Sequence, residues 1–161
     1  MEIAKSEESF LVKPEEKKTF AFRETLTLVT FYLGPFLFGI PAEKVVEINK
    51  DLDITPVPLA ENYILGIMNL RGEILTVIDL TKKLELKAQV QPKLNLIIKA
   101  EEETPVSFVI EKIGDILEVP LSKLEPPPER VEGLKKEYID RVYQLPDRLL
   151  ILLKIEKIFE N

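Results

Sequence analysis

The sequence predicts a mainly β protein that folds as two related small β-barrels packed together, with short helical turns after some strands. Two observations predict this class. The 161-residue chain contains many short runs of β-branched and aromatic residues, separated by turn-forming Gly, Pro, Asn and Asp. Two hairpin-like segments also repeat each other at a constant spacing, which is typical of an internally duplicated fold.

The repeat relates residues 63–84 to residues 138–159 at an offset of 75. A weaker repeat relates residues 44–48 to 115–119 at an offset of 71, and a pair of prolines recurs at an offset of 70. The shared apolar positions are best explained as core. The matched apolar pairs are Tyr63 with Tyr138, Ile64 with Ile139, Ile67 with Val142, Leu70 with Leu145, Ile74 with Leu149, Leu75 with Leu150, Val77 with Leu152, Ile78 with Leu153, Leu80 with Ile155 and Leu84 with Phe159. Lys82 also matches Lys157, and the recurring prolines are Pro56 with Pro126 and Pro58 with Pro128.

The first elements follow from local composition. Residues 1–22 mix Glu and Lys with isolated Phe and show no sustained period, so we predict an N-terminal extension and a folded domain over residues 23–161. Thr25–Leu33 is rich in β-branched and aromatic residues and predicts a strand. Gly34-Pro35 turns the chain, and Phe36–Ile40 predicts the return strand.

The next segment leads to the clearest hairpin of the chain. Pro41–Ile48 is compatible with a helical turn or a strand, and its alternating apolar residues favour a strand. Asp51–Pro58 is expected to be a loop that its prolines hold extended. The apolar runs Ile64–Leu70 and Glu73–Leu80 are separated by Arg71-Gly72, and Gly accepts the positive φ that a tight hairpin turn needs. About one helical turn is expected after this hairpin.

The rest of the chain predicts a second set of strands. Leu149–Leu153 is an unbroken apolar run, which indicates a strand buried on both faces or in the seam between the barrels. The expected elements are strands at Leu94–Lys99, Val106–Ile113 and Ile116–Pro120, a charged loop at Ala100–Pro105, a polyproline connector at Pro126–Pro128, and a hairpin at Tyr138–Phe159 that turns at Pro146-Asp147 and ends in a helical turn.

Charge and composition exclude several classes of function. The net charge of −6 argues against sequence-independent nucleic-acid binding, which needs a cationic face. No apolar run approaches the roughly 18 residues that span a bilayer, and no secretion signal is visible, so we expect a cytoplasmic protein without direct membrane insertion. The chain has no Cys and no His, which removes thiolate chemistry, Ser–His triads and the commonest transition-metal ligands. We therefore expect no catalytic residues, no metal site and no cofactor.

The two hairpins differ most at their turns. The first turn reads Asn69-Leu70-Arg71-Gly72, and the second reads Gln144-Leu145-Pro146-Asp147. Packing requires only a tight turn, and Pro-Asp supplies one, so the fold does not dictate Arg71. Arg71 is either a solvated turn residue or an interaction residue, since Arg is common in both settings.

Four segments together resemble the CheW family of chemotaxis coupling proteins, which also occur as the regulatory domain of the CheA kinase. The segments are FGIPAEKVVEI, ITPVPLAENYILGIMNLRGEILTVIDL, EKIGDILEVPLSKLEPPP and RLLILLKIEKIF, and NLRG before an apolar strand is the most specific motif. The resemblance covers Thr25 to Phe159. It implies two SH3-like five-stranded β-barrels around a shared hydrophobic seam. It also implies a non-catalytic adaptor that joins chemoreceptors to a CheA-type histidine kinase in membrane-associated arrays.

The resemblance also implies a partner-binding surface. Arg71 matches an arginine that is important for signalling in the family, and Glu47 matches a glutamate thought to pair with it, so we predict a Glu47–Arg71 ion pair. The expected partners are the regulatory domain of the kinase and the cytoplasmic helical hairpin of the receptor, which would bind in an apolar groove with a charged rim. Val45 and Val46 match the groove wall, Ile67, Met68 and Leu70 would line or support the groove, and Asn69 and Gly72 complete the turn.

The chain departs from the family pattern at three places. Arg141 stands where the family usually has Gly after Tyr-Ile-x, so the backbone there need not follow the family's. Lys154 stands where an acidic or polar residue often precedes the last helical turn, and residues 1–22 have no counterpart.

Other functions remain open from the residues. A CheW-like adaptor of another motility or regulatory kinase array shares every feature above. A small-ligand or oligosaccharide-binding β-barrel would bring aromatic residues together on one face. A carboxylate-based hydrolase or hard-cation site would need facing acidic residues, for which Asp51 with Asp53, or Glu101–Glu103, are candidates that loop solvation explains better.

Overall fold

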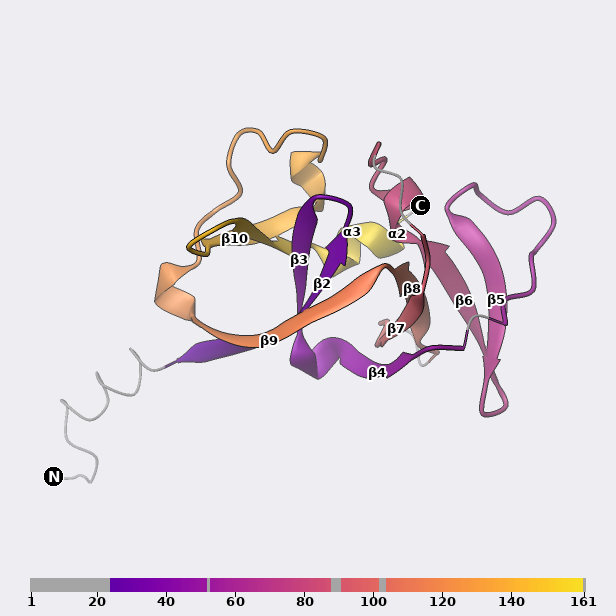
Figure 1. The fold of residues 1–161 in the computed structure, drawn as a ribbon. Helices are drawn as coiled ribbons and strands as arrows, with labels where there is room; N and C mark the ends of the chain where they lie inside the picture. The colour runs from indigo at the N-terminus through magenta and orange to yellow at the C-terminus, as the bar shows by residue number, and fades with distance from the viewer. Residues whose placement is uncertain (1–23, 52, 88–90, 102–103, 161) are drawn as a thin grey trace, which may run out of the picture.

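The protein consists of two five-stranded sheets (Figure 1). The structure is a computed structural model that describes residues 24–51, 53–87, 91–101 and 104–160. The predicted extension at residues 1–22 lies outside the described residues. The terminal sheet has the order β10-β11-β3-β2-β9, and the central sheet has the order β4-β7-β8-β6-β5. The prediction of a mainly β fold with two related five-stranded units is confirmed.

The strands and helical turns have the following bounds. The terminal sheet contains β2 (Thr25–Leu33), β3 (Phe36–Pro41), β9 (Lys112–Pro120), β10 (Ile139–Gln144) and β11 (Leu149–Leu153). The central sheet contains β4 (Val45–Asn49), β5 (Ile64–Leu70), β6 (Glu73–Asp79), β7 (Leu94–Ile98) and β8 (Val106–Ile110). The helical turns are η1 (Ala42–Lys44), α2 (Leu80–Lys83), η2 (Leu121–Lys123), η3 (Lys136–Tyr138) and α3 (Ile155–Phe159). None of the helices in the described part of the chain is long and apolar enough to cross a membrane.

The duplication is visible in the order of the strands. The hairpin β5–β6 corresponds to β10–β11, and the edge strand β4 corresponds to β9. In each sheet the second hairpin strand pairs in parallel with one further strand, which is β8 beside β6 and β3 beside β11. Because β3 comes from the start of the chain, the second copy is completed by N-terminal strands. The two ends of the domain therefore lie in one sheet.

Two predicted boundaries need correction. Pro41–Ile48 is neither helix nor strand alone, because η1 precedes β4. The strands predicted at Val106–Ile113 and Ile116–Pro120 are divided at the wrong place: β8 ends at Ile110, and β9 runs unbroken from Lys112. A register irregularity opposite Thr30 accommodates one extra residue of β9, and Thr30 Oγ1 donates to the carbonyl of Asp115 there. Such a bulge lets a strand continue where the sequence suggests a break.

The core has a shared part and one part inside each sheet. The shared cluster draws buried residues from both sheets, which confirms the predicted hydrophobic seam. Its fully buried aromatic residues are Phe31, Phe38 and Phe108. A separate cluster in the central sheet contains Met68, Leu70, Leu75, Val77, Ile97 and Val109, and the cluster in the terminal sheet contains Leu28, Leu37, Val119, Leu150 and Leu152.

The two hairpins carry the same bulge with different residues. The register shifts between Ile64 and Gly66 in β5, and between Ile139 and Arg141 in β10. Gly66 has a φ of +152°, and a Cβ there would lie 2.1 Å from the carbonyl oxygen of Thr55. Arg141 is not among the residues with positive φ. Glycine is therefore required at this bulge in the first copy and dispensable in the second.

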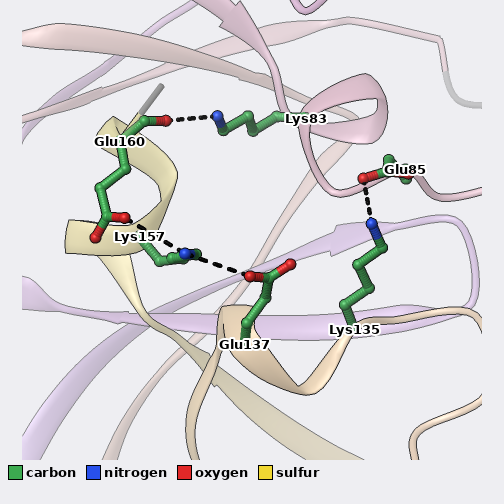
Figure 2. Close-up of polar contacts among 6 residues, drawn as sticks. All are labelled: Lys83, Glu85, Lys135, Glu137, Lys157 and Glu160. Carbon is green, nitrogen blue, oxygen red and sulfur yellow. Dashed lines mark hydrogen bonds and ion pairs between the residues drawn. The ribbon is translucent and has the colours of Figure 1, made fainter.

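The helical turns of the two sheets are joined by polar contacts (Figure 2). Lys83 of α2 donates to the backbone carbonyl of Glu160, just beyond α3, at 2.8 Å. Lys157 of α3 lies 3.3 Å from Glu137 of η3. The first contact joins the helical turns that follow the two hairpins, and the second joins two helical turns that flank strands of the terminal sheet.

Candidate functional site

The tip of the β5–β6 hairpin is a tight turn with two residues at positive φ. Arg71 has a φ of 50° and Gly72 a φ of 88°, as a type I′ turn requires at its two central positions. The side chain of Asn69 fixes the turn, because its Oδ1 accepts the N–H of Gly72 at 2.8 Å. The predicted hairpin and its turn are confirmed.

Arg71 occupies this position against its local preference. A left-handed backbone brings Cβ close to the following carbonyl, so Gly, Asn and Asp are the usual residues there. Residues held in such conformations concentrate at functional sites. The equivalent turn of the second copy uses Pro146-Asp147 instead. An arginine at this tip is thus unexplained by folding alone.

Arg71 is joined to Glu47 by a two-pronged ion pair, as predicted. Its Nη2 donates to Glu47 Oε1, and its Nη1 donates to Glu47 Oε2 at 3.4 Å. Asn49, two residues along β4, donates from Nδ2 to the same Oε2 at 3.5 Å. The pair links the hairpin tip to β4, which is the opposite edge strand of the central sheet.

The ion pair shifts both titrations but stays open to solvent. Hydrogen bonds from Arg71 hold the pKa of Glu47 below its ordinary value, and the Glu47 carboxylate raises the pKa of Arg71. The Arg71 side chain is 69% exposed and that of Glu47 is 27% exposed. Solvent screens so exposed a pair, so its main effect is to orient the guanidinium rather than to stabilise the fold.

Apolar side chains lie on β4 beside Glu47. Val46 is 42% exposed and Ile48 is 44% exposed, so alternate residues of this edge strand face solvent. Val45 is half-buried and packs against the shared core. The two valines predicted for the groove wall therefore differ: Val46 is available to a partner, whereas Val45 mainly supports the strand.

The apolar residues of β5 are mostly interior. Met68 and Leu70 are 4% and 8% exposed and belong to the core of the central sheet. This burial favours a supporting role for both residues, and Met68 also borders the hollow beside the tip. Ile67 is half-buried and borders a hollow of about 160 Å³ next to the tip, together with Asn69 and Ile74.

Sequence reasoning missed three residues near the tip. Ile48 and Ile74 are exposed apolar residues, at 44% and 52%, and Asn49 helps to orient Glu47. The alternation of Val46 with Ile48 was a usable signal, since both residues share one face of a strand. Ile74 lies in an apolar run whose two faces look alike in the sequence, so no local signal separates it from its buried neighbours.

The acidic candidates of the sequence analysis act within a loop. The N–H of Asp53 donates to Asp51 Oδ1 at 3.0 Å, and the N–H of Asp51 donates to Asn49 Oδ1 at 2.6 Å. These short-range bonds are typical of Asx turns. Residues 102–103 of the other acidic candidate lie outside the described residues. Among residues the structure does describe, no group of three or more His, Cys, Asp or Glu side chains could hold a metal ion.

Comparisons with known proteins agree with this architecture. A family model described as a CheW-like domain matches residues 27–161. A chemotaxis protein CheW from Treponema pallidum is 34% identical, over 86% of this chain and 84% of its own length. A CheW from Helicobacter pylori is 28% identical over 86% and 84% of the two chains. The structure of the scaffolding protein TtCheW from Thermoanaerobacter tengcongensis superimposes with a TM-score of 0.78 at 26% identity, covering 86% of this chain and 90% of that one.

Proposed function

Because this chain belongs to the CheW family, we propose that it is a non-catalytic adaptor that couples chemoreceptors to a CheA-type histidine kinase in chemotaxis signalling. The observation that carries the proposal at the level of residues is Arg71, an exposed arginine held at positive φ and aimed by Glu47. Nothing in the packing of the hairpin requires it. A residue kept in this state suits recognition of another protein.

The receptor would bind as a helical hairpin along β4. Val46 and Ile48 offer exposed apolar side chains on one face of this edge strand, and Glu47, which alternates with them, offers charge with Arg71 on the other face. Apolar contacts then supply area while the charged pair sets the orientation of the helices. The regulatory domain of the kinase is the second partner. In this proposal the protein is held at cytoplasmic receptor arrays through its partners.

The fold gives less support to a ligand-binding barrel. That alternative would bring aromatic side chains together on an open face. Phe31, Phe38 and Phe108 are instead fully buried in the shared core.

The test is reconstitution with receptor-containing membranes and the kinase from the same organism. Binding to the kinase regulatory domain is measured by calorimetry, and kinase activation by phosphate transfer. We expect Arg71→Glu and Glu47→Lys each to reduce activation at least tenfold with an unchanged melting temperature. The matched control is Lys123→Glu, an equal charge change at an exposed residue of η2, and it should retain activity.

The double variant sharpens the test. Arg71→Glu combined with Glu47→Lys can re-form an ion pair with reversed polarity. If the ion pair only positions the turn, the double variant regains kinase activation. If a partner contacts the arginine itself, the double variant stays inactive. Wild-type activation by all three variants would refute the proposed site. No binding to kinase or receptor would refute chemotaxis coupling and direct the search to another kinase array.

A further inference from the structure

An open apolar hollow lies beside the parallel strands β6 and β8 of the central sheet, away from the Arg71 tip. Its volume is about 530 Å³. Tyr63, Ile64, Val106 and Phe159 line it and are each half-buried. The ring of Phe159 rests on that of Phe108, with centroids 6.0 Å apart, so one wall is anchored in the core.

Among the described residues, the charged ones that line this hollow are acidic. They are Glu101, Glu156 and Glu160. Lys83 shows what this environment attracts: its Nζ lies 4.2 Å from the centroid of the Tyr63 ring and donates to the carbonyl of Glu160 (Figure 2). A cation thus already occupies the corner where Tyr63 meets Glu160.

The other copy shows what covers the equivalent residues. At an offset of 75, Tyr63, Ile64 and Phe159 correspond to Tyr138, Ile139 and Leu84. These three counterparts are 8%, 2% and 0% exposed. The same positions are therefore covered in the terminal half and open in the central half.

The cover is the chain's own segment 129–135. Val131 and Leu134 of this segment pack into the shared core and keep Leu84 buried, although the segment, Leu84 and Glu85 still border a hollow of about 740 Å³. Lys135 then forms an ion pair with Glu85 at 2.7 Å (Figure 2). Glu85 is the counterpart of Glu160 at the same offset. The occupant in this half is a short turn with two apolar side chains followed by a lysine.

A difference in loop length explains why only one copy is covered. Tyr138 follows Pro128 by ten positions, whereas Tyr63 follows the matching Pro58 by five. The shorter loop cannot place an apolar turn over the groove. Leu59, directly after Pro58, is instead fully exposed.

We propose that the open groove beside β6 and β8 is a second docking site, for a linear peptide segment of a partner protein that carries apolar residues followed by a lysine. The peptide would lie as residues 129–135 lie in the other copy. Its apolar side chains would contact Ile64, Val106 and Phe159, and its lysine would join Lys157, whose Nζ lies 3.3 Å from Glu160 Oε1, at the Glu160 carboxylate. This site is separate from the Arg71 tip and does not depend on it.

The test uses the chain's own segment as the probe. A capped peptide of residues 129–136, ERVEGLKK, is titrated into the isotope-labelled full chain and followed by two-dimensional NMR up to about 2 mM, a range that detects dissociation constants near 1 mM. We expect shift changes confined to residues 63–64, 76–78, 104–106 and 156–160. A peptide with Lys135→Glu is expected to bind at least fivefold more weakly.

Two protein variants distinguish docking in the groove from non-specific binding of the peptide. Thr76 is exposed and lines the groove, so Thr76→Tyr fills the groove without disturbing the core and should abolish the shifts. Glu160→Lys should weaken the wild-type peptide at least fivefold and restore binding of the Lys135→Glu peptide. Absence of shifts at 2 mM, shifts elsewhere on the surface, or equal binding by Thr76→Tyr would each overturn the proposal.

Discussion

Replacing Gly66 by alanine should destabilise the central sheet by about 3 kcal/mol. The added Cβ would lie 2.1 Å from the Thr55 carbonyl oxygen and 2.9 Å from the Pro56 Cα, so the loop must move away. That movement breaks both backbone hydrogen bonds between Thr55 and Ile67, each 2.8 Å long. Two such bonds contribute about 1–3 kcal/mol net, and alanine at this φ adds about 1–3 kcal/mol of strain.

The assay is thermal and urea unfolding of the full chain. A loss of about 3 kcal/mol lowers the melting temperature of a domain of this size by about 6–12 °C. Arg141 is the matched control, because it occupies the same bulge at ordinary φ. Arg141→Ala should stay within about 0.5 kcal/mol of wild type. If Gly66→Ala has the same melting temperature as the wild type, the loop that contains Thr55 and Pro56 is not held against β5, and the predicted clash does not occur.

Three further predictions address the hairpin tip and the helical turns. Because Arg71 holds the pKa of Glu47 below its ordinary 4.5, the ion pair contributes to folding stability above that pH, and this contribution is lost as the pH falls through the lowered pKa. An NMR titration of the Glu47 carboxyl should therefore give a lower midpoint in the wild type than in Arg71→Asn, and equal midpoints would contradict this. Arg71→Asn should leave the melting temperature unchanged or raised while kinase activation falls, since Asn tolerates positive φ; a clear loss of stability would show that the arginine serves the fold. The side chain of Asp79 caps α2 by accepting the N–H of Lys82, whereas Lys154 makes no such bond at the start of α3. In urea unfolding, Asp79→Ala should lower the free energy of unfolding by about 1 kcal/mol and Lys154→Asp should raise it by about the same amount. A more stable Asp79→Ala variant would refute the assignment of the cap.

Much of the fold could be predicted because local signals were strong. β2 and β5 start and end at the predicted residues, and β6 differs only at its last residue, where alternation and turn chemistry agree. The break predicted within β9 is wrong because Gly114-Asp115 has the composition of a turn but lies inside the strand. Its bulge is set by Thr30, which lies 85 residues away from Asp115, and no local window contains such a partner.

The candidate site was predictable where charge was involved and less so where apolar side chains were. The Glu47–Arg71 pair came from resemblance, and the geometry agrees with it. Met68 and Leu70 could not be separated from exposed apolar residues by type. A hairpin that covers a small core from one side exposes some apolar residues on the other, so Leu75 is buried while its neighbour Ile74 is half-exposed.

The duplication offers a further argument about where function lies. Equivalent positions in the two copies share one packing problem, so a difference between them is informative only if the fold accepts both solutions. The turns meet that condition, with Arg71 in one copy and Pro146 in the other. The loops after Pro58 and Pro128 meet it too, because one leaves the core residues beside the groove half-exposed and the other covers their counterparts with its own Val131 and Leu134. Core positions carry the same apolar character in both copies and distinguish nothing. Partner recognition is therefore expected at the places where the copies differ and the open copy exposes apolar or charged groups.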